Sequence, residues 1–282
     1  MTSKKAPAKI NLYLRVVRKR SDGYHDIISL MQLISLYDEL TFVQRASGIM
    51  VKCPGSILPE DENNLVYRAA AGFYDRSGLK PGIEITLQKH IPVGAGLGGG
   101  SSDAATTLVT LNELHNSPLS TEELLRLGES LGADIPFFIF GKTAWASGKG
   151  EMLTEAPSLP LFWIVLINPG FPVSTKEVYQ GLNLGLTKKI IKYSIPCFSS
   201  VKEAASGLVN DLERVTLTLH PALAEIKAFL LKNGALGAAM TGSGPTMFGV
   251  FTDEASAQRV RRISVAQDGW LTFCACSLQG NL

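Results

Sequence analysis

The chain has 282 residues, which is enough for one large domain or two domains of ordinary size. Its composition, 45% hydrophobic and 18% charged, excludes a disordered chain, and no apolar run reaches the ~20 residues of a membrane span. A formal net charge of +2 favours neither nucleic acid nor a membrane surface as a partner. No signal peptide is visible and the four cysteines form no CxxC or zinc pattern, so we expect a cytoplasmic protein.

The first part of the chain is predicted to form mainly strands. Apolar residues partly alternate with polar ones over 10–17, and an apolar segment follows over 26–35 after a Ser-Asp-Gly turn at 21–23. Residues 40–45 and 49–53 predict a further pair of strands. These segments together indicate an antiparallel sheet.

A helix and one more strand follow. Leu65, Ala69 and Phe73 recur at helical spacing, which predicts a helix over 64–76. Residues 83–89 predict a strand. This strand leads directly into the most informative segment of the chain.

Residues 92–105 form a glycine-rich run, Pro-Val-Gly-Ala-Gly-Leu-Gly-Gly-Gly-Ser-Ser-Asp-Ala-Ala, in which five of the seven positions 94–100 are glycine. Glycine lets the backbone adopt positive φ and approach a ligand closely. We expect Ser101 or Ser102 to cap a helix over 103–114, whose first turn directs free N–H groups at the loop. The run therefore predicts a site for a polyanion such as a nucleotide phosphate.

Two other nucleotide-binding patterns fit the run poorly. Residues 94–99 satisfy GxGxxG, but a dinucleotide site needs an early βαβ unit with an acidic residue ending its second strand. The acidic residue about twenty positions further on, Glu113, lies within a helical pattern. No Gly-Lys-Ser/Thr follows the glycines, which excludes the P-loop of NTPases. A flexible loop, or glycines that let a helix approach the sheet closely, is the remaining alternative.

Helices and strands alternate in the rest of the chain. Ser120 predicts the start of a helix over 121–131, and apolar runs at 137–140 and 143–146 predict short strands. A Pro-rich stretch at 156–160 then separates the two halves. After it we expect strands over 162–167, 246–251 and 271–277 and helices over 175–182, 201–217, 221–232 and 254–262, with 183–198 unassigned. This pattern predicts an α+β fold of two domains joined near residue 157.

The glycine-rich run resembles the phosphate loop of the GHMP small-molecule kinases. Five other segments resemble the family in the same order and spacing: Ala-Lys-Ile-Asn-Leu at 8–12, Asp-Gly-Tyr-His at 22–25, Gly-Ala-Asp-Ile-Pro at 132–136, Asn-Asp-Leu-Glu at 210–213 and Thr-Gly-Ser-Gly-Pro at 241–245. The resemblance covers nearly the whole chain. It implies a two-domain GHMP kinase fold, with an N-terminal mixed sheet-and-helix nucleotide domain over 1–156 and a C-terminal ferredoxin-like α/β sandwich over 157–282.

The resemblance also implies ATP as co-substrate and Mg²⁺ as its companion ion. The residues that it places around ATP are Pro92, Val93, Gly94, Ala95, Gly96, Leu97, Gly98, Gly99, Gly100, Ser101, Ser102, Asn64 and Leu65. Of these, Asn64 and Leu65 are expected at the adenine, with Lys89 nearby. Ser101 or Ser102 is the candidate metal ligand, and no carboxylate ligand is assigned.

Asp134 and Lys9 are the expected catalytic pair. Asp134 follows Gly-Ala and precedes Ile-Pro, a setting that favours a capping or turn aspartate when taken alone. The family's Gly-Ala-Asp-x-Pro motif instead implies the base that removes the proton of the acceptor hydroxyl. Lys9 lies in the family's Lys-x-Asn pattern, which implies a positive charge beside this base and the transferred phosphoryl group. The sequence alone does not bring the two residues together.

The resemblance assigns the remaining site residues to the acceptor: Asn11, Tyr24, His25, Tyr179, Gly242 and Ser243. Tyr24 is expected to stack on a cytosine ring while His25 hydrogen-bonds its edge. Tyr179 is the candidate for the opposite side of the ring, with a half-buried helix tyrosine as the equal alternative. Gly242 and Ser243 are expected in a loop that closes over the phosphates or the acceptor.

The resemblance thus implies an ATP-dependent kinase that phosphorylates the 2-hydroxyl of a cytidine-diphosphate-linked methylerythritol in the non-mevalonate isoprenoid pathway. Another GHMP kinase, acting on mevalonate, homoserine or a sugar, is the nearest alternative, and those acceptors offer no base for Tyr24 to stack on. A catalytically silent sensor of nucleotide or substrate is the second alternative, which retention of Lys9 and Asp134 disfavours. We expect a monomer or a weak homodimer.

Overall fold

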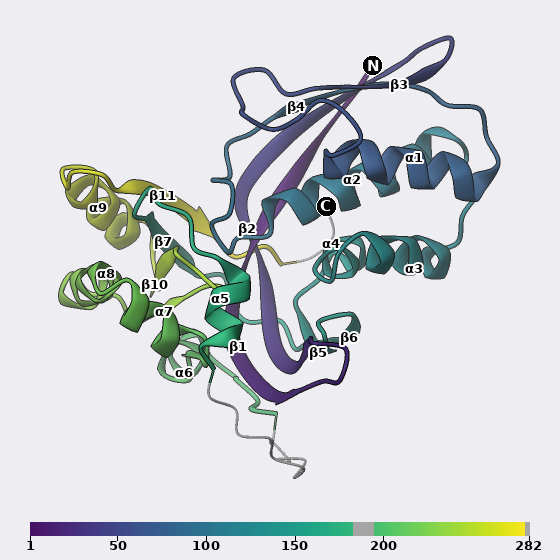
Figure 1. Cartoon of the computed structure of the whole chain (residues 1–282). Coiled ribbons are helices and arrows are strands. Elements are labelled where there is room, and N and C mark those ends of the chain that lie inside the picture. The colour runs from purple at the N-terminus through teal and green to yellow at the C-terminus, as the bar shows by residue number, and fades with distance from the viewer. Residues whose placement is uncertain (183–194, 280–282) are drawn as a thin grey trace.

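Two sheets and their covering helices build the chain, in a computed structural model that describes residues 1–182 and 195–279 (Figure 1). Most of the unassigned segment 183–198 lies outside the described residues. The strands are β1 (Thr2–Lys19), β2 (His25–Gln44), β3 (Gly48–Lys52), β4 (Gly82–Gln88), β5 (Ala144–Gly148), β6 (Met152–Glu155), β7 (Trp163–Asn168), β8 (Val209–Asn210), β9 (Gly237–Met240), β10 (Met247–Phe251) and β11 (Leu271–Cys276). The helices are α1 (Leu65–Ser77), α2 (Gly99–Leu114), α3 (Thr121–Leu131), α4 (Ile135–Phe140), α5 (Thr175–Gln180), α6 (Val201–Ser206), α7 (Glu213–Leu219), α8 (Ala222–Lys232) and α9 (Glu254–Ser264).

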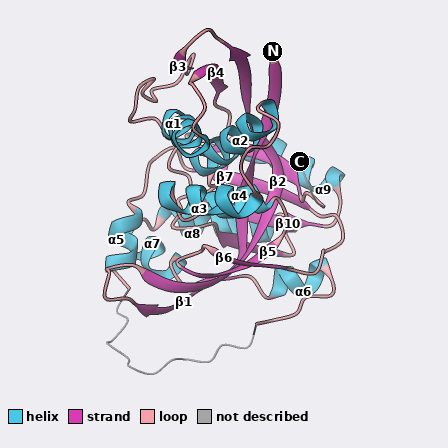
Figure 2. Cartoon of the chain, turned by 90° about the vertical axis from the view of Figure 1, so that its right-hand side faces the viewer, coloured by secondary structure: helices cyan, strands magenta, loops and turns pink. Residues whose placement is uncertain are grey.

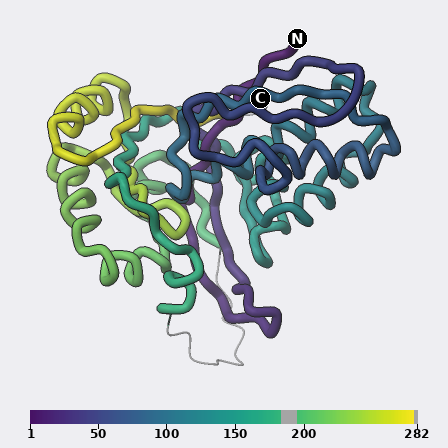
Figure 3. The backbone as a smooth tube through the Cα atoms, turned by 45° about the horizontal axis from the view of Figure 1, so that its top comes forward, coloured from purple at the N-terminus to yellow at the C-terminus, as the bar shows by residue number. Residues whose placement is uncertain are grey.

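A long antiparallel hairpin is the spine of the first sheet. β1 and β2 pair from Thr2 with Phe42 to Lys19 with His25, with bulges along the way. The strand order is β3-β4-β2-β1-β8, and β5 and β6 extend the other end of β2. Figure 3 shows this hairpin between the helices of the first half and the green and yellow elements of the second.

Helices α1 to α4 cover one face of this sheet (Figure 2). Phe42, Phe73, Leu108 and Phe137 are fully buried between them. The expected strand over 137–140 is wrong, because these residues belong to helix α4. Residues 137–140 are all apolar, so they show neither helical nor strand periodicity, and a short run of this kind fits a buried helix as well as a buried strand.

The second sheet has the antiparallel order β11-β7-β10-β9. With helices between the first and second and between the third and fourth strands, this is the ferredoxin-like arrangement that the sequence predicts. Helices α8 and α9 cover the outer face through Ile226, Leu230 and Val260. The inner face packs on the first sheet, so the two halves share one core.

The two halves are connected by strand pairing as well as by packing. The predicted division after residue 156 falls between β6 and β7, yet β8 from the second half pairs with Tyr13 and Leu14 of β1. The expected helix over 201–217 is also interrupted there, because Gly207 ends α6 and β8 follows. Strand β9 was not predicted. Among the described residues, no helix combines the length and apolarity needed to cross a membrane.

Candidate active site

A cavity of about 990 Å³ lies where the two halves meet, and its walls come from segments far apart in the sequence. They include the middle of β1, the tip of the β1–β2 hairpin, the glycine-rich loop, the Asp134 corner, the turn between β5 and β6, helix α5 and the loop after β9. Its volume is in the upper range for sites that take nucleotide-sized ligands. Lys9, Asn11 and Asp134 form a connected polar group in its wall.

The glycine-rich loop supplies Gly94, Gly96 and Gly98 to the cavity wall, each with a positive φ between 67° and 75°. Helix α2 begins at Gly99 with Gly98 as its N-cap, so the expected cap by Ser101 or Ser102 is wrong. The left-handed turn at Gly98 starts the helix early. Both serines therefore lie in its first turn, and only Ser101 lines the cavity.

The loop after β9 packs backbone to backbone against the glycine-rich loop. A Cβ at Gly96 would lie 2.3 Å from the carbonyl oxygen of Thr241, and one at Gly242 would lie 3.0 Å from the carbonyl oxygen of Gly96. The Thr241 hydroxyl donates to that same Gly96 carbonyl at 3.2 Å. Both glycines also have positive φ, so an L side chain would be strained as well as crowded at either position.

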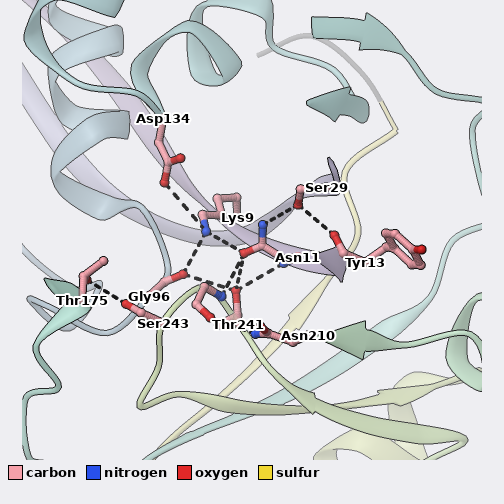
Figure 4. Close-up of polar contacts among 11 residues, drawn as sticks. Lys9, Asn11, Tyr13, Ser29, Gly96, Asp134, Thr175, Asn210, Thr241 and Ser243 are labelled. Carbon is pink, nitrogen blue, oxygen red and sulfur yellow. Dashed lines mark hydrogen bonds and ion pairs between the residues drawn. The ribbon is translucent and has the colours of Figure 1, made fainter. Parts of the chain in front are cut away.

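Lys9 lies at the centre of the polar groups (Figure 4). Ile10 and its alternate neighbours on β1 face the second sheet, so Lys9 points the other way, towards the glycine-rich loop. Its Nζ donates to Asn11 Oδ1 at 2.7 Å and to the Gly96 carbonyl at 3.1 Å, and it lies 3.8 Å from Asp134 Oδ2. Burial lowers the pKa of Lys9, and the Asp134 charge opposes this shift.

Asn11 joins the two halves of the site. Its Nδ2 donates to the Ser29 hydroxyl at 2.8 Å, and its Oδ1 accepts from the Gly242 backbone N–H at 2.9 Å as well as from Lys9. The Ser29 hydroxyl in turn donates to the Tyr13 carbonyl at 2.8 Å. The side chain of Asn11 therefore positions Lys9 and the loop after β9 through protein contacts, and Asn11 also lines the cavity, so its contact with a substrate stays a prediction.

Asp134 stands at the corner between α3 and α4. It precedes the first residue of α4, and its side chain makes no capping hydrogen bond. With 38% of that side chain exposed, the carboxylate faces the cavity while Lys9 beside it is buried. The described structure thus brings together Lys9 and Asp134, the two residues that the sequence predicts as a pair.

The aromatic residues gather near the tip of the β1–β2 hairpin. The rings of His25 and Tyr179 are 4.9 Å apart at 30°, whereas Tyr24 is 60% exposed. Burial, with a further contribution from Asp134, raises the pKa of Tyr179 to about 12, so its phenol keeps its proton. Burial and the charge of Lys19 lower the pKa of His25, which favours the neutral imidazole. All three aromatic side chains line the cavity.

Some predicted residues lie away from the cavity. Asn64 caps α1 by accepting from the Val66 N–H and donates to the Pro59 carbonyl, so its polar atoms are already engaged. Leu65 begins α1 and packs at the edge of the first core. Of the residues assigned to the glycine-rich loop, Ala95 and Leu97 are buried in the core between the sheets. Gly242 and Ser243 do line the cavity.

The structure also adds residues that the sequence reasoning missed. Thr175 bonds the Ser243 hydroxyl at 2.7 Å, and Asn210 donates to the Gly242 carbonyl at 2.8 Å. Asn210 lies in the recognised segment 210–213, which was the available signal for it. Lys149 also lines the cavity, in a turn that carries no motif. No group of three or more His, Cys, Asp or Glu side chains suited to a metal occurs within residues 1–182 and 195–279.

The sequence and the fold have counterparts among known proteins. Residues 64–142 match the GHMP kinases N terminal domain, and residues 194–263 match the GHMP kinases C terminal domain. A solved homoserine kinase from Cytophaga hutchinsonii is similar in fold, with 19% identity, a TM-score of 0.72 and 100% and 96% of the two chains covered. The chain belongs to the GHMP kinases and is therefore a phosphotransferase.

Relatives with higher sequence identity to this chain indicate one kinase within this family. A 4-diphosphocytidyl-2-C-methyl-D-erythritol kinase of Syntrophus aciditrophicus is 54% identical over 273 residues, or 97% of this chain and 98% of that protein. One from Geobacter metallireducens is 46% identical over 276 residues, with the same coverage. A solved 4-(cytidine 5'-diphospho)-2C-methyl-D-erythritol kinase has a TM-score of 0.83 at 34% identity, over 99% of this chain and 100% of that one. Within the GHMP kinases, the chain belongs to this kinase family.

Proposed function

We propose that this chain uses ATP to phosphorylate the 2-hydroxyl of 4-diphosphocytidyl-2-C-methyl-D-erythritol, a step of the non-mevalonate isoprenoid pathway. The single observation that carries the proposal is the Lys9–Asp134 pair at 3.8 Å between a glycine-rich loop and a group of aromatic rings. The names of the relatives supply the acceptor. We further propose the domain limits 1–156 and 157–282, and a cytoplasmic monomer or weak homodimer.

Asp134 takes the proton of the acceptor hydroxyl. The oxygen then forms a bond to the γ-phosphorus of ATP while the bond to the β–γ bridging oxygen breaks, and ADP leaves with that electron pair. Asp134 suits this role because its carboxylate is open to the cavity and makes no capping hydrogen bond. The ammonium of Lys9 keeps this carboxylate ionised and stabilises negative charge on the phosphoryl group.

The backbone of the glycine-rich loop holds the phosphates of ATP. The N-terminus of α2, which has 16 residues, points its free N–H groups to the same place. We keep Asn64 and Leu65 as the proposed adenine contacts, at the start of α1. Ser243 and Gly242 would close the loop after β9 over the phosphates or the acceptor.

Mg²⁺ fits this site as an ion carried mainly by the phosphates. Protein sites for Mg²⁺ with ATP use few side-chain oxygens, so the lack of a ligand cluster among the described residues agrees with this chemistry. Ser101 lines the cavity, and the Ser102 hydroxyl next to it is buried without a hydrogen-bond partner, so one of these two hydroxyls would hold the ion. When bound, Mg²⁺ neutralises charge on the β- and γ-phosphates.

The pyrimidine end of the acceptor would occupy the aromatic group. Tyr24 and Tyr179 offer ring faces, and His25 offers a polar edge for cytosine. His25 and Tyr179 already lie against one another, with ring centres 4.9 Å apart and planes tilted by 30°, which places the His25 ring beside the ring of Tyr179.

The release of ADP with three acceptors tests the proposal. We expect turnover with the cytidyl substrate and none with mevalonate or homoserine. Turnover with mevalonate or homoserine alone would assign the chain to another GHMP activity. Tight binding of ATP without turnover of any of the three acceptors would favour a silent sensor.

A further inference from the structure

Lys149 lies in the cavity between the aromatic group and Asp134. We propose that its ammonium binds the diphosphate of the acceptor and so makes the site select a nucleoside diphosphate over a nucleoside. This inference rests on the proposed function, because it assigns one more part of the same acceptor. The sequence alone does not single out Lys149, because no recognised motif surrounds it.

The turn between β5 and β6 holds Lys149 in place. Its neighbours Gly148 and Gly150 have φ of 70° and 125°, conformations that few L residues adopt. The backbone N–H of Lys149 donates to Glu151 Oε2 at 2.6 Å, which closes the turn. A Cβ at Gly150 would lie 4.0 Å from Asp134 Oδ1, so the turn packs against the corner that carries the base.

The side chain of Lys149 reaches from this turn to the aromatic group. Its Nζ lies 5.6 Å from the centre of the Tyr24 ring, on the ring face. Tyr24 is the residue assigned to the base, and Asp134 is the residue assigned to the acceptor hydroxyl. In the proposed acceptor the diphosphate connects the base to the alcohol. The ammonium of Lys149 contacts the residue assigned to the first of these ends, and its turn packs against the residue assigned to the second.

The ammonium of Lys149 is free to take a new anion. Its acidic neighbours are Glu129 and Asp22, which lies within range of its charge. Glu129 Oε1 is 3.7 Å away, a contact longer than a hydrogen bond, and the Glu129 side chain is 43% exposed. Over the residues that the structure describes, the Nζ of Lys149 makes no hydrogen bond to the protein, whereas Lys9 already donates to Asn11 and to Gly96. A diphosphate is a stronger partner than one solvent-exposed carboxylate.

The acceptor also explains why the ammonium rests on Tyr24. A cation over a tyrosine face gains a modest attraction, on the order of 0.5–1 kcal/mol at exposed sites. A base that stacks on this face takes the position of the ammonium, and the diphosphate attached to that base is then the adjacent anion. Lys149 exchanges a weak contact for a charge-assisted hydrogen bond.

Binding of CDP and of cytidine to the unmodified chain and to Lys149→Gln tests this inference by calorimetry. We expect the unmodified chain to bind CDP more tightly than cytidine, and the variant to lose roughly 10-fold or more of that preference with unchanged affinity for cytidine. The preference of the unmodified chain should fall as salt is added. In turnover, KM for the cytidyl substrate should rise by a similar factor, with KM for ATP unchanged.

Lys142→Gln is the matched control, because Lys142 precedes the same hairpin and pairs with Glu155 at its surface. It should keep the full preference for CDP. The inference is overturned if Lys149→Gln keeps the preference for CDP over cytidine, or if its affinities for the two ligands fall equally. It is also overturned if the unmodified chain binds CDP no more tightly than cytidine. Absence of turnover with the cytidyl substrate would instead overturn the proposed function, which the binding ratio does not measure.

Discussion

The carboxyl group of Asp103 provides a quantitative prediction on stability. Asp103 and Asp38 share the ammonium of Lys89, which donates to Asp103 Oδ2 at 2.7 Å and also to Asp38. Asp38 accepts in addition from the backbone N–H groups of His90 and Ile91 at 2.6 and 2.9 Å. The other oxygen of Asp103 is buried without a partner. Asp103 is thus the less satisfied of two buried carboxylates.

Burial raises the pKa of Asp103 from 3.8 to about 7, against the attraction of Lys89 and with the repulsion of Asp38. The folded chain therefore holds a proton that the unfolded chain loses above pH ~4, so stability falls as the pH rises from ~4 to ~7. Each unit of difference between the folded and unfolded pKa of Asp103 changes the free energy of unfolding by about 1.36 kcal/mol, which gives a total near 4 kcal/mol. Two of the three units lie between pH 5 and pH 7, or about 3 kcal/mol.

Asp103→Asn removes this titration and keeps the shape of the side chain. Urea unfolding of both proteins at pH 5 and pH 8 measures the difference in their free energies of unfolding. We expect that difference to shift by about 3 kcal/mol in favour of the variant at the higher pH. Asp75→Asn, at an exposed position of α1, is the control and should show no such shift. A difference that is the same at both pH values would refute the reasoning.

Three further predictions concern the site. Asp134→Asn should lower kcat by roughly 10²- to 10⁴-fold and leave the affinity for ATP nearly intact; near-normal turnover would remove Asp134 as the base. Gly96→Ala should cost about 3 kcal/mol in urea unfolding, from backbone strain at φ 75° and the 2.3 Å approach to Thr241, whereas Gly100→Ala, with open space around it, should cost nothing. Tyr179→Ala should raise KM for the cytidyl substrate, measured by ADP release, without changing KM for ATP; equal increases would place Tyr179 outside the acceptor pocket.

Local chemistry made much of the first half predictable. The helix over 121–131 has the same bounds in the structure, where Ser120 and Glu123 form the capping box that the sequence indicates. The start of α2 was not predictable in this way, because Ser101 and Ser102 look like caps when only neighbouring residues are considered. The left-handed Gly98 begins the helix instead, in a place where a Cβ would meet the Phe138 ring at 2.8 Å.

The candidate site depends on contacts that no local pattern contains. Each glycine-rich segment alone predicts a turn, but the contact of Gly96 with Thr241 makes the two loops one unit. That unit reaches Lys9 through Asn11, which bonds both Lys9 and the backbone of the second loop. The position of the ammonium therefore depends on residues more than two hundred positions away in the chain. A first half without the second would keep Asn11 and Gly96, the direct partners of Lys9, but would lose the contacts from Gly242 and Thr241 that hold these two partners in place. The placement of Lys9 beside Asp134 therefore depends on the interface between the two halves.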